Sequence, residues 1–323
     1  MKLKLLVLDD WEGYMAKNPC WDDLTELGSV RFLTEPISTI PDLELKDISF
    51  IVALRERTAL TEHVFNRLPQ LKLIFQTGGG THHIDHQAAM KRDISIAIDR
   101  KSKAMQTSVP ELTIALILGT MHLIPQAQQA MRSGRWPLLT GRTLNSRRLG
   151  ILGFGREGSG VASIAKNAFN MEVVSWARPG SQTERPSDIP GLTLEELLQT
   201  SDVVSIHLML SPESTGLLNA ERLKIMKKGS VLINTSRGGI IDEEALIDAL
   251  TNGPLAAAGL DVFANEPLPP NSRLRKLDNV MLSPHIGWTV EEVFADFAQT
   301  ACRQVKLYLQ GKLPASDLIT NAL

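Results

Sequence analysis

The sequence predicts an α/β protein with two domains, each built on a doubly wound parallel sheet. Three observations carry this prediction. The chain has 323 residues, a length typical of two domains. Strand-like apolar segments alternate with helix-like segments almost from end to end, which favours parallel sheets covered by helices. One of these strands runs into a glycine-rich turn, GFGREG, that opens a helical pattern.

The first third of the chain contains four predicted strands, KLLVLDD, ISFIVAL, KLIFQT and ISIAI. Helical patterns such as TEHVFNRL and DHQAAMKR separate the later ones. Just before the second helix, HHIDH places His82 and His86 four residues apart, which is also a metal-binding spacing. We favour the alternative, in which Asp85 is the N-cap of the helix, because no further ligand cluster occurs elsewhere. No metal site is predicted.

The middle of the chain predicts a complete second sheet. A helical region from about Pro110 to Arg132 comes first. Asn219 and Asp242 stand at N-cap positions of later helices. Six apolar segments in this region read as the strands of one doubly wound sheet. They are RLGILGF, EVVSWA, DVVSIHL, SVLINT, AAAGLDVF and NVMLSPH.

The last long segment, TVEEVFADFAQTACRQVKLYLQG, predicts one amphipathic helix in which Thr289 and Glu292 form a capping box. The second sheet is already complete before it, so we expect this helix to cross back to the first domain. The predicted domains are therefore residues 1–104 plus 289–323, and residues 105–288.

Composition excludes several classes of protein. The net charge is −2, and no block of like charge favours nucleic acid or an anionic membrane as a partner. MKLKLLVLDD turns acidic too early for a signal peptide. LTIALILGTMHLI is short and interrupted by polar residues, so it predicts a buried or interface helix and no membrane span. Cys20 and Cys302 lie far apart in sequence and fit a reducing compartment, so we expect a cytoplasmic protein.

The glycine turn has the context of a dinucleotide site. Gly153, Gly155 and Gly158 have G-x-G-x-x-G spacing, between an apolar strand and a helix. They permit a tight turn, a close approach of a pyrophosphate, and close packing of helix on strand. The alternative is a glycine turn in an α/β unit that binds no nucleotide. Glu157 is unexpected here, because a carboxylate repels a pyrophosphate unless its side chain turns outward.

Three charged residues follow three successive predicted strands. Arg237 comes after SVLINT, Glu266 after AAAGLDVF, and His285 at the end of NVMLSPH. Because the carboxyl ends of parallel strands meet at one edge, we expect them to converge. An imidazolium can donate a proton to the carbonyl of a 2-oxo acid, and a neighbouring carboxylate favours the charged form of the ring and fixes its orientation. A guanidinium can bind the carboxylate of the substrate. Taken singly, a turn arginine, a loop glutamate and a capping histidine would each be ordinary.

These segments together resemble the family of D-isomer-specific 2-hydroxyacid dehydrogenases, which includes the glyoxylate and hydroxypyruvate reductases and the phosphoglycerate dehydrogenases. The matching stretches cover nearly the whole chain. They include THHIDHQAAMKRDI, SVPELTIALIL, RLGILGFGREG, LINTSRGGIIDEEALIDAL, AGLDVFANEPL and SPHIG. The resemblance implies two Rossmann-like domains, the first flavodoxin-like and substrate-binding and the second dinucleotide-binding, with an active-site cleft between them.

The resemblance also assigns roles by position. It places the family's catalytic residues at Arg237, Glu266 and His285. Asp261 is expected at the nicotinamide carboxamide, and Arg55 and the N–H groups of Gly78, Gly79 and Gly80 at the substrate. The other expected cofactor-binding residues are Gly153, Gly155, Arg156, Glu157, Gly158, Ala177, Arg178, His207, Leu208, Thr235 and Gly287.

The end of the strand EVVSWA indicates which cofactor is used. NAD-binding units commonly carry an acidic residue here, which binds the ribose hydroxyls and repels a 2′-phosphate. The matching position is Ala177, and the guanidinium of Arg178 beside it suits a phosphate. We predict that NADP(H) is favoured, with NAD(H) possible. The alternative is that Arg178 is an ordinary solvated loop residue.

The prediction for function is a reductase that transfers hydride between a nicotinamide cofactor and a small 2-oxo acid. A homodimer is expected to form through the helical region 110–132. Two alternatives remain: a nucleotide-sensing corepressor-like binding protein, and a formate- or phosphite-type dehydrogenase. No nucleic-acid or membrane partner is expected.

Overall fold

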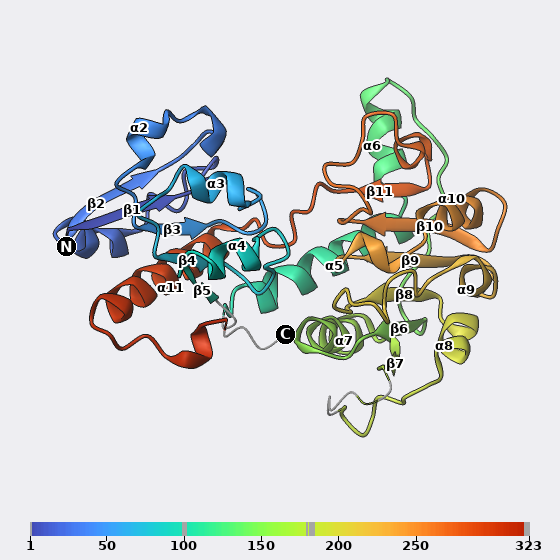
Figure 1. Ribbon diagram of the computed structural model, residues 1–323. Coiled ribbons are helices and arrows are strands. Elements are labelled where there is room, and N and C mark those ends of the chain that lie inside the picture. The colour runs from blue at the N-terminus through green and yellow to red at the C-terminus, as the bar shows by residue number, and fades with distance from the viewer. Residues whose placement is uncertain (1, 99–101, 179, 181–184, 320–323) are drawn as a thin grey trace. The chain divides into compact units, whose positions relative to one another are not determined.

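The computed structural model describes residues 2–98, 102–178, 180 and 185–319 (Figure 1). The chain divides into two compact units, Met1–Ala104 with Thr289–Leu323, and Met105–Trp288. Each unit contains one sheet whose strand pairs are all parallel, with helices packed on it. The predicted fold class, two Rossmann-like α/β domains, is confirmed.

The first unit has a five-stranded sheet in the order β2-β1-β3-β4-β5, the strand order of flavodoxin-like folds. Its strands are β1 (Leu3–Val7), β2 (Gly28–Phe32), β3 (Phe50–Ala53), β4 (Leu73–Gln76) and β5 (Ser95–Ile98). Four were predicted, and β2 was not. β2 is an edge strand in which half-buried and exposed residues alternate, so it lacks the continuous apolar run of the central strands β3 and β4.

Five α-helices accompany this sheet: α1 (Asp22–Thr25), α2 (Asp42–Leu45), α3 (Glu62–Asn66), α4 (His86–Met90) and α11 (Glu291–Leu309). Asp85 caps α4 as predicted, accepting a hydrogen bond from the Ala88 N–H over 2.9 Å. The side chain of Gln304 on α11 donates to the Ile98 carbonyl at the end of β5, over 3.1 Å. The last long helix therefore belongs to the first unit.

The predicted capping box of α11 is wrong. The helix begins at Glu291, and its N-cap is Val290, which makes no side-chain capping bond. Thr289 lies one residue too early to be the cap, and Glu292 is at the second helical position, where the box requires the third.

The second unit has a six-stranded sheet in the order β11-β10-β9-β8-β6-β7. All six predicted strands are present: β6 (Arg148–Leu152), β7 (Glu172–Trp176), β8 (Val203–Ile206), β9 (Ser230–Asn234), β10 (Leu255–Leu260) and β11 (Val280–Leu282). The chain leaves β6 for β7 on one side and returns to β8 on the other. The strand order therefore reverses between β6 and β8, the kind of place where α/β sheets bind ligands.

Six α-helices pack with this sheet: α5 (Met105–Met121), α6 (Ile124–Arg132), α7 (Arg156–Phe169), α8 (Leu194–Thr200), α9 (Ala220–Lys224) and α10 (Glu243–Thr251). The helical region expected at 110–132 is two helices and starts earlier, at Met105. The chain bends by 66° between α5 and α6, where Leu123 has a φ of 57°. No helix in the described ranges is by itself long and apolar enough to cross a membrane, although this bent pair reaches the length together.

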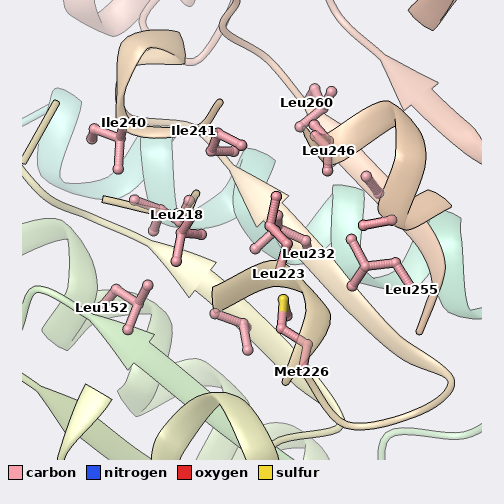
Figure 2. Close-up of a cluster of buried hydrophobic side chains, with 14 of the residues drawn as sticks. Leu152, Leu218, Leu223, Met226, Leu232, Ile240, Ile241, Leu246, Leu255 and Leu260 are labelled. Atoms are coloured by element: carbon pink, nitrogen blue, oxygen red, sulfur yellow. The ribbon is translucent and has the colours of Figure 1, made fainter. Parts of the chain in front are cut away.

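Apolar side chains hold the second sheet between its helices. On one face, Leu116 and Ile117 of α5 pack with Val231 and Ile233 of β9. Figure 2 shows the cluster on the other face, where residues of β9, β10, α9 and α10 meet; Leu223, Leu232, Leu246 and Leu260 are among them. This packing fixes the strand ends, and with them the loops that carry the candidate site.

Candidate active site

The three predicted catalytic residues follow three neighbouring strands of the second unit. Arg237 follows β9, Glu266 follows β10, and His285 follows β11. β10 pairs in parallel with both β9 and β11, so the three strands end at the same edge of the sheet. Their loops bring the charged side chains together.

His285 and Glu266 are in direct contact. The Nδ1 atom of His285 donates to Oε2 of Glu266 over 2.6 Å, and the Phe263 N–H donates to the other carboxylate oxygen over 2.9 Å. Burial raises the pKa of Glu266, but the bond to His285 and the charges of His285 and Arg237 outweigh it and hold that pKa below its ordinary value. Glu266 is therefore ionised at neutral pH and orients the imidazole ring. Nε2 is the ring nitrogen left for proton transfer.

Arg237 approaches this pair because a glycine follows it. A Cβ on Gly238 would lie only 1.9 Å from the carbonyl carbon of Phe263, so the loop after β9 passes directly against the loop after β10. The guanidinium lowers the pKa of Glu266 through its charge, and its Nη1 donates to the Ser236 carbonyl over 2.7 Å. A cation, a carboxylate and an imidazole therefore share one strand-end cluster.

Asp261, at the end of β10, holds the segment that carries His285. It is fully buried. Its Oδ1 accepts from the Ile286 N–H over 2.9 Å and from the Ser283 hydroxyl over 2.6 Å, and its Oδ2 accepts from the Gly287 N–H over 2.9 Å. His285 has a φ of 55°, an uncommon conformation for a residue other than glycine. Hydrogen bonds on both sides of His285 stabilise that conformation.

Sequence reasoning did not foresee this function of Asp261. The sequence placed it at the nicotinamide carboxamide, and a carboxylate has lone pairs for further bonds. The observed partners of its side chain all lie in the segment that carries His285. Gly287, expected near the nicotinamide, is part of the same network, since its carbonyl accepts from the Ser108 hydroxyl over 2.6 Å.

The glycine turn after β6 has the shape that a pyrophosphate requires. Gly153 has a φ of 94°, and a Cβ on Gly158 would lie 2.2 Å from the Gly153 oxygen. A Cβ on Gly155 would meet nothing within 4 Å, so the backbone there is open to a ligand. α7 begins at Arg156, and its N-cap Gly155 makes no side-chain capping bond; the N-terminus of a helix is a favourable place for an anion. Glu157 lies half-buried in that first turn.

His207 and Leu208 face the same turn from the end of β8. A Cβ on Gly153 would lie 2.5 Å from the His207 oxygen and 2.8 Å from the Leu208 side chain. Burial lowers the pKa of His207 to about 4, and its Nε2 is 2.8 Å from the Ser205 hydroxyl. The histidine is therefore neutral at physiological pH. Both residues lie at the point where the strand order reverses.

Thr235 follows β9, two residues before Arg237. Its Oγ1 is 2.9 Å from Oγ1 of Thr113 on α5. The loop that carries Arg237 is thus hydrogen-bonded to α5, the helix whose Ser108 also binds Gly287.

A cation follows β7, as the sequence indicated. Nη1 of Arg178 donates to the Ser211 hydroxyl over 2.9 Å and lies 3.8 Å from Oε2 of Glu213. The Ser211 hydroxyl donates to the same glutamate oxygen over 2.6 Å. Ala177, directly after the strand, adds no charge. Arg178 therefore belongs to a polar cluster and is not surrounded by solvent alone.

In the first unit, the glycine loop after β4 packs against two charged side chains. A Cβ on Gly78 would lie 2.0 Å from Nη1 of Arg55, and one on Gly80 would lie 2.0 Å from Oε1 of Glu56. Nε of Arg55 is 3.3 Å from Oε2 of Glu56. Arg55 is only 5% exposed, so it lies against the loop, whereas Gly79 is exposed.

Histidines and acidic side chains are also the residues that bind metal ions. Across the described parts of the chain, no three His, Cys, Asp or Glu side chains gather as a metal site. His86, one of the spaced histidines, places Nε2 3.2 Å from the Thr81 carbonyl.

Two α/β units with parallel sheets, one of them with a glycine-rich turn between a strand and a helix, are the architecture of dinucleotide-binding proteins. The profile of the D-isomer specific 2-hydroxyacid dehydrogenase NAD binding domain matches residues 114–287. A glyoxylate reductase of Thermofilum pendens is 38% identical over 264 residues, covering 78% of this chain and 76% of that protein.

Solved structures agree along nearly the whole chain. A Thermus thermophilus protein superimposes with a TM-score of 0.82 and 33% identity, over 98% of this chain and 100% of that one. A D-lactate dehydrogenase from Aquifex aeolicus, solved with NAD and lactic acid, gives a TM-score of 0.79 and 28% identity over 99% and 100%.

The chain belongs to the D-isomer specific 2-hydroxyacid dehydrogenase family. It is a nicotinamide-dependent oxidoreductase that acts on the CH–OH group of hydroxy acids. The comparisons favour neither a corepressor-like binding protein nor a formate- or phosphite-type dehydrogenase.

Proposed function

We propose that the protein reduces a small 2-oxo acid to the D-2-hydroxy acid, with His285 as the proton donor. The observation that carries this proposal is the 2.6 Å hydrogen bond between His285 and Glu266 at neighbouring strand ends. The ionised carboxylate accepts the proton of Nδ1, which fixes the ring and turns Nε2 toward the substrate in the proposed complex. A positioned imidazolium can donate its Nε2 proton to a carbonyl oxygen.

Each charged residue has one task in this proposal. The bound nicotinamide supplies the hydride. Nε2 of His285 delivers a proton to the carbonyl oxygen of the substrate, while Glu266 holds Nδ1 and stabilises the ring. The guanidinium of Arg237 binds the substrate carboxylate and polarises the carbonyl group. Asp261 keeps His285 in position for this transfer. In the oxidative direction, the same histidine accepts the proton.

The first unit is proposed to contribute further contacts to the substrate carboxylate. The N–H groups of Gly78, Gly79 and Gly80 would hold its carboxylate, and Arg55 would position this loop from beneath. The names of related proteins suggest a substrate of the size of glyoxylate, since the Thermofilum pendens relative is a glyoxylate reductase.

The second unit is proposed to bind the dinucleotide, with NADP(H) preferred over NAD(H). The turn from Gly153 to Gly158 would hold the pyrophosphate. His207, Leu208, Thr235, Asp261 and Gly287 would line the path toward the nicotinamide. Arg178 would bind the 2′-phosphate, which Ala177 leaves room for. Glu213 now partners Arg178, so a phosphate would compete with that carboxylate.

A substrate panel tests the proposal directly. Glyoxylate, hydroxypyruvate, pyruvate and bulkier 2-oxo acids are each assayed with NADPH and with NADH. We expect reduction of at least one small 2-oxo acid to the D-isomer, with higher kcat/KM for NADPH. No reduction of any member, with the folded protein still binding NADPH, would contradict the proposed reaction.

We also propose a homodimer, for which the exposed apolar side chains give support. The helical region 110–132 was expected to form the dimer, but the apolar residues of its first helix, α5, are buried in their own unit. Exposed apolar side chains lie instead on α6 and on the segment after it. There the exposed apolar residues are Ile124, Met131, Trp136, Leu138 and Leu139. Sedimentation of the wild type and of Leu138→Glu tests this: monomers for both at micromolar concentration would refute the dimer.

A further inference from the structure

The two cysteines of the chain, which the sequence separates widely, meet in the first unit. Cys20 lies in the short 3-10 helix Pro19–Trp21, and Cys302 lies on α11. Both line one cavity of about 410 Å³, and each thiol is near enough to the other to change its pKa. Neither thiol is in a disulfide.

The surroundings make the two thiols unequal. Cys20 is partly exposed, whereas Cys302 is only 3% exposed. The neighbouring Cys302 thiol lowers the pKa of Cys20, and the nearby Lys306 ammonium lowers it further, against the opposing effect of burial. The neighbouring Cys20 thiol and burial raise the pKa of Cys302. Lys306 lines the cavity and is ion-paired with Asp23.

An accessible thiol with a lowered pKa and a second thiol in contact is the arrangement of a redox pair. We propose that Cys20 and Cys302 are a modification site at which a peroxide forms an intramolecular disulfide. This inference does not depend on the proposed reductase reaction, since the site consists only of first-unit residues and the charged cluster is in the second.

The chemistry balances with the peroxide as the only oxidant. The Cys20 thiolate attacks one peroxide oxygen, and the O–O bond breaks; Cys20 becomes a sulfenic acid, and the leaving oxygen takes up protons as water. The sulfur of Cys302 then attacks the Cys20 sulfur and forms the S–S bond. The hydroxyl leaves with the Cys302 proton as a second water. Two thiols are oxidised, and one peroxide is reduced.

Hydrogen peroxide applied to the full-length protein tests this proposal. We expect both thiols to disappear together and the intact mass to fall by two hydrogens. One cross-linked peptide pair should contain Cys20 and Cys302, and dithiothreitol should reverse the change. Separate oxidation of the cysteines to oxygen adducts, disulfides only between chains, or thiols that react only after denaturation would each overturn it.

Two substitutions assign the roles. In Cys302→Ser the sulfenic acid on Cys20 should persist, gaining one oxygen and reacting with a dimedone-type probe. In Cys20→Ser the buried Cys302 should react severalfold more slowly than Cys20 does in the wild type. Equal reactivity of the two single variants would contradict the assignment of Cys20 as the attacking thiol.

Lys306, beside the two cysteines, can be tested against a matched control lysine. Lys306→Gln should slow disulfide formation severalfold, because the thiolate of Cys20 loses its stabilising charge. Lys312→Gln makes the same charge change at an exposed residue that does not line the cavity, and it should leave the rate unchanged. Equal rates for both variants would show that Lys306 does not activate Cys20.

Discussion

The Asp261 side chain binds the two backbone N–H groups that directly follow His285, a residue with an uncommon backbone conformation. Its carboxylate accepts the N–H groups of Ile286 and Gly287, next to His285 with its φ of 55°. Such conformations persist where the surrounding structure stabilises them. The proton donor proposed here is thus oriented twice, by Asp261 through its backbone and by Glu266 through its ring.

Replacing Asp261 by asparagine should separate these two effects. Asparagine keeps one acceptor oxygen and turns a donor toward an N–H group, so a buried hydrogen bond is lost. We expect a stability loss of about 1–3 kcal/mol and a lower kcat, with NADPH binding retained. Asp278→Asn, at an exposed position, is the control. An unchanged kcat in Asp261→Asn would mean that His285 needs no such support.

Glu266→Gln should alter the dependence of stability on pH. The pKa of Glu266 in the folded protein is below its ordinary value of 4.5. Its stabilising contribution is therefore present above that value and is lost as pH falls through the lowered pKa. The difference in Tm between wild type and Glu266→Gln should be largest near neutral pH and shrink below about pH 4.5.

A double-mutant cycle tests whether His285 is the partner through which Glu266 stabilises the fold. Adding Glu266→Gln to His285→Gln should cost much less stability than adding it to the wild type, because the hydrogen bond is already gone. Equal costs in the two backgrounds would show that the pair is not coupled.

The apolar pattern of the second unit was sufficient to place its strands, and therefore the three charged residues at one edge. Strands buried on both faces read as continuous apolar runs, and β8 and β9 are of this kind. The edge strand β2 lacks that run and was missed. The predicted capping box was wrong because α11 begins one residue later than the box requires.

Contacts between distant segments gave no signal in the sequence. The main-chain N–H groups of Ile286 and Gly287 donate to the Asp261 side chain and so join two loops. Every residue except proline carries such a group, so the sequence does not mark the partners. The meeting of Cys20 with Cys302 arises only because α11 returns to the first unit. Likewise, the pairing of Arg178 with Glu213 requires the loops after β7 and β8 to be placed in space.

Arg237→Lys should be strongly impaired. A lysine carries the charge but cannot bind a carboxylate with two parallel hydrogen bonds. The loss of one charge-assisted hydrogen bond, about 1.5–3 kcal/mol, corresponds to a fall in kcat/KM of roughly ten- to hundredfold. Arg222→Lys, at an arginine paired with Glu195 in a partly exposed contact, should retain activity. If Arg237→Lys also retains it, the arginine is structural.

The cofactor preference should depend on the two residues after β7. The double variant Ala177→Asp/Arg178→Ala should shift the ratio of kcat/KM for NADPH and NADH toward NADH by roughly ten- to hundredfold. Glu213→Gln should shift it the other way, because Arg178 loses its competing carboxylate. A wild type that prefers NADH, or a ratio that the double variant leaves unmoved, would make Arg178 an ordinary loop residue.

His285 is the proposed proton donor, and the turnover of His285→Ala is the sharpest check of that role. The rate of NADPH oxidation at saturating 2-oxo acid is measured for this variant and for His63→Ala, which removes an exposed histidine of α3. Binding of NADPH is followed in parallel by fluorescence. We predict a kcat lower by roughly 10²–10⁴-fold for His285→Ala, with NADPH binding unchanged and His63→Ala fully active. A near-normal kcat for His285→Ala would contradict the account.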